Sequence, residues 1–379
     1  MREARWLHPG AWWLWALGLA AAASRTTNPL LLLLLIGAAT IVVQARRPEA
    51  PWARSFAFFL RLGVLVIVIR VLVQVLFGAA VGTTTVLDLP GVALPTWMAG
   101  VRLGGDVTME SLLMALYDGL RLATILICIG AANSLASPTR LLKSVPAALY
   151  ELGVSVVVAL TFTPQLVSDV DRLRTTRRLR GRQYRGIRAI AASAVPVLEG
   201  SLERSVTLAA AMDSRGYGRR GDVPTARRRL TATLLLAGLV ASAIGVYGLV
   251  ASGSPALLGL PMLAVGLGSA GTALAVAGRS RVRTRYRPDP WAIPEWLVAA
   301  AGIVTAATFA GAAWAAVPGM TTPFDPPAWP ALPLIALLGI VVAVTPALTA
   351  PRVPRAVPRT VPRNVVDPEP RPTQQEVPA

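Results

Sequence analysis

Cysteine, histidine and charged residues are all scarce in this sequence of 379 residues. Cys128 is the single cysteine and His8 the single histidine, so a disulfide framework and a metal cage of histidine and cysteine ligands are excluded. A Ser-His-Asp triad would have to use His8, which stands beside Pro9 near the N-terminus. Only 15% of the residues are charged, against about a quarter in a soluble domain. The sequence therefore predicts neither a soluble enzyme nor a metalloprotein, and we expect no metal ion and no cofactor.

The abundant residues are apolar or basic. Apolar residues make up 54% of the chain, and 37 lysines and arginines against 19 acidic residues give a formal net charge of +18. This combination is typical of an inner-membrane protein whose arginine-rich segments stay on the cytoplasmic side. Because the basic residues flank apolar runs without interleaved aromatic residues, they predict no nucleic-acid partner. We expect an all-α, multi-pass protein in the lipid bilayer of the plasma membrane.

Nine apolar runs are candidates for membrane crossings, because a crossing needs about 20 apolar residues. The first two are short and separated by only four residues, which favours a tight hairpin. The runs cover residues 12–23, 28–43, 56–80, 110–133, 150–167, 230–250, 256–277, 296–317 and 331–350.

The basic residues predict the orientation of these runs. Residues 168–229 hold 15 arginines against six acidic residues and are predicted to be cytoplasmic, whereas residues 81–109 are predicted to be an outside loop. If residues 110–133 run from outside to inside, residues 150–167 cannot also cross and leave the arginine-rich segment inside. The simplest solution places residues 134–167 in helices along the cytoplasmic face. It gives about eight crossings with both termini cytoplasmic.

The arginine-rich segment itself predicts two long amphipathic helices. From about Pro196, apolar residues recur at steps of three and four, and residues 167–179 also suit a helix. Each helix ends in an arginine followed by a glycine, and glycine just past a helix end is the favoured left-handed cap. These two ends are Arg180-Gly181 and Arg215-Gly216.

Two helices with arginine tips could dock into two equivalent pockets on a pair of partner subunits. A guanidinium can bind a carboxylate in bidentate fashion, and loss of such an interface arginine costs about 2–5 kcal/mol. The alternative is that each arginine caps its helix and contacts anionic lipid. The presence of two such ends, 35 residues apart, favours docking.

These residues resemble the transmembrane T component of energy-coupling factor (ECF) transporters, the EcfT/CbiQ family. That family has two cytoplasmic coupling helices, each ending in Ala-Arg-Gly or a close variant. Residues 171–181 resemble the first helix end and residues 210–218 the second, and residues 137–142 and 162–164 extend the likeness over about residues 10–250. Leu179 and Ser214 stand where the family usually has alanine, and Arg185-Gly186 competes with the first motif.

The resemblance implies a coupling subunit that is not itself an enzyme. Family members bridge two ABC-type ATPases to a small membrane S component that binds a vitamin or a metal ion. In keeping with this, the sequence contains no G-x-x-x-x-G-K-[ST] motif for binding ATP. Arg180 and Arg215 would then transmit the motion of the ATPases to the S component.

The predicted organisation has three parts. Residues 1–250 form the EcfT/CbiQ-like membrane domain, with the coupling helices at about residues 134–229. Residues 251–350 add further transmembrane helices, and residues 351–379 form a tail rich in proline and arginine that is predicted to be extended and largely disordered.

Charged residues inside apolar runs leave two alternatives open. Arg70, Asp118 and Arg121 could form ion pairs between helices, or they could serve a stand-alone secondary transporter. A third reading is a membrane scaffold that uses residues 168–229 to recruit cytosolic proteins.

Overall fold

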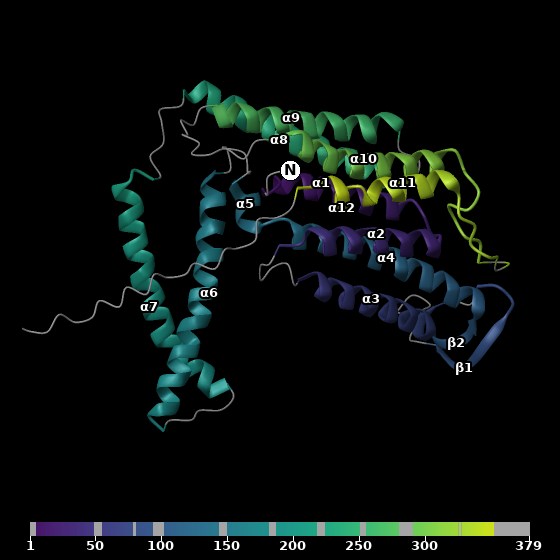
Figure 1. Cartoon of the computed structure of the whole chain (residues 1–379), viewed down its shortest axis with the longest axis horizontal. Helices are drawn as coiled ribbons and strands as arrows, with labels where there is room; N and C mark the ends of the chain where they lie inside the picture. The colour runs from purple at the N-terminus through teal and green to yellow at the C-terminus, as the bar shows by residue number, and fades with distance from the viewer. Residues whose placement is uncertain are drawn as a thin grey trace, which may run out of the picture. The chain divides into compact units, whose positions relative to one another are not determined.

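A computed structural model describes residues 5–48, 55–78, 81–93, 102–143, 150–181, 187–217, 224–250, 255–279, 291–324, 326 and 328–351. The predicted all-α class is confirmed, since long helices dominate these residues (Figure 1). The chain divides into two compact units. One contains helices α1–α4, two strands and α10–α12, and the other contains α5–α9.

The apolar runs form helices of membrane-spanning length. Among the described residues, seven helices are long and apolar enough to cross a membrane. They are α2 (Pro29–Arg46), α3 (Ser55–Phe77), α4 (Met109–Leu135), α6 (Tyr150–Leu179), α8 (Thr225–Val250), α9 (Leu260–Arg279) and α10 (Ile293–Trp314). The other apolar helices, α1 (Pro9–Ser24) and the segment Leu334–Thr349 that holds α11 and α12, are shorter.

In the first unit, the C-terminal helices pack on the N-terminal ones. Trp15 of α1 is fully buried, and its Nε1 donates to the carbonyl of Ala343 in α11 (Leu334–Val344) at 3.0 Å. The backbones of α1 and α10 approach so closely that a Cβ on Gly18 would lie 2.2 Å from the carbonyl oxygen of Gly302. This contact requires glycine at both positions, because any side chain there would meet backbone.

The connection between α1 and α2 is tied to the segment that follows α10. Asn28 caps α2 by accepting from the backbone N–H of Leu30 at 3.0 Å. Its Nδ2 donates to the carbonyls of Gly319 and Ala331 at 2.7 and 2.6 Å. At the other end of α10, Arg5 Nη2 contacts both oxygens of the buried Glu295, at 2.8 and 2.5 Å. Helices α10–α12 are therefore an integral part of the first unit, whereas the predicted boundary at residue 250 separates them from α1–α4.

The segment at residues 81–109, predicted to be an outside loop, contains two β-strands that the sequence analysis did not predict. Strands β1 (Thr85–Ala93) and β2 (Arg102–Thr108) form an antiparallel hairpin in which Asp88 pairs with Asp106. The carboxylate of Glu110, at the start of α4, accepts hydrogen bonds from the hydroxyl and the N–H of Thr84 and holds the base of the hairpin. The pattern was hidden because Pro90, Gly91, Gly104 and Gly105 interrupt the alternation of apolar and polar residues that identifies strands.

The second unit contains two helical pairs. Helices α8 and α9 pack along small residues: a Cβ added to Gly266 of α9 would lie 2.5 Å from the backbone nitrogen of Ser242 in α8. Helix α5 (Pro138–Lys143) contacts α6, which in turn contacts α7 (Ile187–Ser214).

Candidate functional site

Helix α6 is one continuous helix, which corrects the predicted division near residue 167. It joins the apolar run at 150–167 to the arginine-rich stretch that follows, and Pro164 lies inside it. The portion Gly153–Arg177 is long and apolar enough to span a membrane. The placement of residues 134–167 along the cytoplasmic face stays a prediction. A proline inside a helix removes its own N–H from the helical ladder and crowds the carbonyl four residues before it, yet apolar helices tolerate it.

Helix α7 begins nine residues earlier than predicted, at Ile187 instead of Pro196. Residues 187–195 are mostly alanine, isoleucine and other residues compatible with a helix, so the helix continues through Pro196. The predicted apolar stripe is present and faces outward: Leu198, Leu202 and Val206 are 59%, 65% and 69% exposed. Most of the surface of these three side chains is therefore uncovered within the described part of the chain.

The two helix ends have the backbone conformation that the glycines predict. Gly181 and Gly216 have φ of +71° and +74°, in the left-handed region. At the end of α7, the N–H of Tyr217 donates to the carbonyl of Met212 at 3.0 Å, and the N–H of Gly216 to that of Asp213 at 2.8 Å. These two bonds form the Schellman motif, which terminates a helix sharply. The competing Arg185-Gly186 pair lies outside the described residues.

Arg180 and Arg215 are both exposed at these ends. The backbone N–H of Arg180 still donates to the carbonyl of Thr176 at 3.1 Å, so this arginine belongs to the last turn of α6. Because the following glycine turns the chain away, each guanidinium is left at a helix tip with room to reach a partner. Leu179, which precedes Arg180, is 85% exposed.

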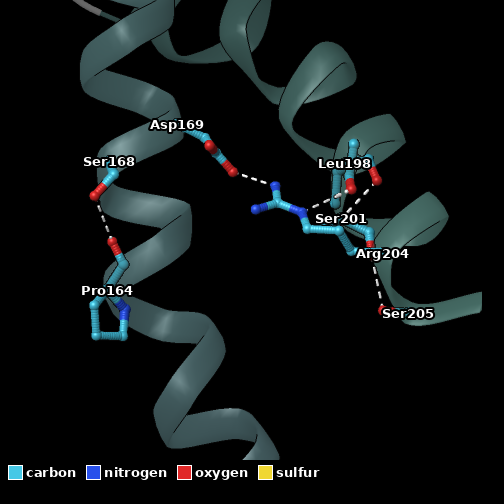
Figure 2. Close-up of polar contacts among 8 residues, drawn as sticks. Pro164, Ser168, Asp169, Leu198, Ser201, Arg204 and Ser205 are labelled. Atoms are coloured by element: carbon cyan, nitrogen blue, oxygen red, sulfur yellow. Dashed lines mark hydrogen bonds and ion pairs between the residues drawn. The ribbon is translucent and has the colours of Figure 1, made fainter. Parts of the chain in front are cut away.

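An ion pair that the sequence analysis missed joins the two helices. Asp169 of α6 accepts from Arg204 of α7, and the Nε of Arg204 also donates to the carbonyl of Gly200 at 3.1 Å (Figure 2). The two side chains are 26% and 38% exposed. The pair could not be found from the sequence, since nothing in a helical pattern shows which residue of another helix will lie opposite.

A shallow groove of about 530 Å³ runs beside this ion pair. It lies between α6 and α7 and has a mixed polar and apolar lining. The lining residues are Thr161, Phe162, Gln165, Glu203, Arg204, Thr207, Leu208 and Ala211. Helix α6 and helix α7 are therefore not closely packed at this level, and the ion pair bridges them next to an open groove.

The charged residues of the apolar runs lie in the other unit and do not form one cluster. Arg70 Nη2 of α3 lies 3.2 Å from Asp118 Oδ2 of α4, with the two side chains 29% and 36% exposed. Arg70 Nη1 also donates to Gln74 Oε1 at 3.4 Å. Arg121 instead donates to the backbone carbonyl of Ser24. This arrangement joins α3 to α4, and it separates Arg121 from the pair.

Comparison with known proteins gives a consistent result. The family described as "Cobalt transport protein", CbiQ, matches residues 4–225, which include both helix ends. Among curated proteins, the chain is similar to the energy-coupling factor transporter transmembrane protein EcfT of Streptococcus thermophilus, with 30% identity over 140 residues, or 35% of this chain and 49% of the relative. The EcfT proteins of Lactococcus lactis and Leuconostoc gelidum are each 27% identical, over 33% and 30% of this chain and 52% and 48% of the relative. The chain thus spans about half the length of the curated relatives it matches.

Proposed function

The chain belongs to the CbiQ family of cobalt transport proteins, and we propose that it is the coupling T subunit of an ECF-type importer in the plasma membrane. The observation that carries this proposal is the pair of matched helix ends, in which an exposed arginine precedes a left-handed glycine at the end of both α6 and α7. Two equivalent ends suit two equivalent partner subunits.

In this proposal the partners are two ABC-type ATPases, which hydrolyse ATP, and a small membrane S component, which binds the vitamin or metal ion that is carried. Each guanidinium would pair with an acidic pocket on one ATPase, because a planar guanidinium binds a carboxylate through two parallel hydrogen bonds. The exposed stripe of α7 offers an apolar surface to a further partner.

The proposed mechanism is mechanical. When the ATPases close and open, their pockets move, and the arginines force the ends of α6 and α7 to follow. Rigid helices transmit this motion over their length to the membrane part and to the S component. Arg180 and Arg215 would thus transmit force and perform no bond chemistry.

The test begins with the native complex. We expect a mild-detergent purification of the tagged protein from its own cells to yield two ABC ATPases and a small integral membrane protein, which mass spectrometry would identify. The S component then defines the ligand whose radiolabelled form is used for uptake. A chain that purifies alone, while other membrane complexes stay intact, would contradict the proposal.

The decisive variant is Arg180→Ala combined with Arg215→Ala. We expect uptake to fall at least tenfold while the amount of protein in the membrane is unchanged. The matched control, Arg172→Ala with Arg227→Ala, removes the same charge from exposed positions away from the Arg-Gly ends of α6 and α7 and should retain uptake. Uptake at the wild-type rate in the Arg180/Arg215 variant would refute the coupling role.

A further inference from the structure

The Asp169–Arg204 ion pair stands at equal distances along the chain from the two helix ends. Arg180 follows Asp169 by 11 residues, and Arg215 follows Arg204 by the same 11 residues. At 1.5 Å per residue, each arginine tip lies about 17 Å beyond its member of the pair. Eleven residues also amount to about three turns of 3.6 residues, so each tip lies on nearly the same side of its helix as the ion pair.

The helices run in opposite directions, so the two tips lie on opposite sides of the ion pair (Figure 1). Only seven residues separate Leu179 from Ile187, which keeps the end of α6 near the start of α7. The ion pair therefore occupies the centre of an arrangement with approximate two-fold symmetry, in which each arm ends in Arg-Gly. Two ATPases related by a two-fold axis would meet such ends in the same way.

We propose that Asp169 and Arg204 are positioning residues, which hold α6 and α7 at the crossing where Arg180 and Arg215 are presented as equivalent ends. This inference rests on the proposed coupling function. The hydrogen bond from Arg204 Nε to the carbonyl of Gly200 holds the guanidinium in place while its Nη2 reaches Asp169.

The setting of the pair favours a positioning role over a contribution to stability. The two side chains remain about one-quarter and one-third exposed, and pairs of this kind add little to the stability of a fold. The adjacent groove between the helices leaves room for them to shift against each other. A directional contact at the crossing point would limit that shift.

The distance between the helices can be measured by pulsed electron paramagnetic resonance. In a Cys128→Ser background, nitroxide labels at Thr176→Cys on α6 and Ala210→Cys on α7 would report the crossing, since both positions are exposed. We expect a narrow distance distribution in the otherwise unchanged protein, and a distribution at least twice as broad after Asp169→Asn. The swapped variant, Asp169→Arg with Arg204→Asp, should restore the narrow distribution.

Uptake by the purified complex in liposomes supplies the second measurement. We expect Asp169→Asn to lower the uptake per ATP hydrolysed at least fivefold while both ATPases still co-purify, and the swapped variant to recover most of it. Asp171→Asn is the matched control, because it removes the same charge two residues away, where the carboxylate lies 3.8 Å from Arg174 of its own helix. It should leave both measurements unchanged.

The results distinguish this inference from the proposed function. If Asp169→Asn leaves the distance distribution and the coupling ratio unchanged, or if the swapped variant recovers neither, the positioning role is wrong even though the complex transports. If the unmodified chain binds no ATPase, the proposed function fails, and the label distances alone still show whether the pair sets the crossing.

Discussion

Asn28 offers a quantitative test of how the two ends of the first unit are joined. The side chain is fully buried, its oxygen caps α2, and its Nδ2 donates to the carbonyls of Gly319 and Ala331. Asn28→Ala removes the cap, which costs about 1 kcal/mol, and deprives two carbonyls of a donor, each costing about 1–3 kcal/mol. We therefore expect a loss of at least about 3 kcal/mol in the free energy of unfolding.

Thermal unfolding in detergent, followed by fluorescence-detected size exclusion, measures this effect. With a shift of about 2–4 °C per kcal/mol, Asn28→Ala should unfold at least roughly 6 °C below the wild type. Asn28→Asp keeps the capping oxygen but replaces Nδ2 with a carboxylate oxygen that faces two carbonyls. It should therefore also unfold at a lower temperature than the wild type. Thr40→Ala, which removes a hydroxyl bonded only within α2, is the control and should change little. If Asn28→Ala unfolds at the same temperature as the wild type, these hydrogen bonds do not hold the α1–α2 connection to the segment after α10.

Three further substitutions test the fold and the site. Gly302→Ala would place a Cβ 2.4 Å from the Cα of Trp15 and should destabilise the protein by about 1–3 kcal/mol, whereas Gly311→Ala meets nothing within 4 Å and should be neutral or slightly stabilising in the same thermal assay. Arg70 and Asp118 lie in α3 and α4, which are long and apolar enough to cross a membrane, where an unpaired charge is costly. Asp118→Leu leaves the Arg70 charge unpaired and should lower stability by about 1–3 kcal/mol, with recovery when Arg70→Leu is added. Uptake that is abolished by Asp118→Asn and is sensitive to a protonophore would instead favour a secondary transporter. Gly216→Ala forces φ of +74° on a residue with a side chain, at about 1–2 kcal/mol, and should speed hydrogen exchange in the last turn of α7 without unfolding the protein.

The local features of the fold could be predicted from the sequence, because they depend on neighbouring residues. Long apolar runs predict helices, and glycine after the last helical turn predicts the left-handed ends at Gly181 and Gly216, which the structure confirms. The helix predicted to begin near Pro196 begins at Ile187, so Pro196 lies inside α7, as Pro164 lies inside α6. A long apolar or alanine-rich helix outweighs the cost of one proline.

The contacts between distant segments could not be predicted in this way. The approach of Gly18 to Gly302 joins residues almost 300 positions apart, and no periodicity within either helix identifies the other as its neighbour. The Asp169–Arg204 pair is of the same kind, although the equal spacing of opposite charges before the two Arg-Gly ends is a signal that a search for it would find. The β hairpin was missed because its glycines and proline hide the alternation of strands.

The packing of the first unit depends on helices that lie beyond the family match. The family match ends at residue 225, but the buried faces of α1 and α2 are covered by α10–α12, which lie beyond it. Arg46, at the end of α2, donates through Nε and Nη2 to the carbonyl of Ala347 at 3.0 and 2.7 Å. Ala347 belongs to α12 (Pro346–Thr349), so α12 also holds the end of α2. The proposed coupling role would need a stiff membrane part, because motion absorbed by a soft one does no work on a partner. Helices α10–α12, beyond the family match, therefore contribute rigidity to the first unit, where they pack on α1 and α2.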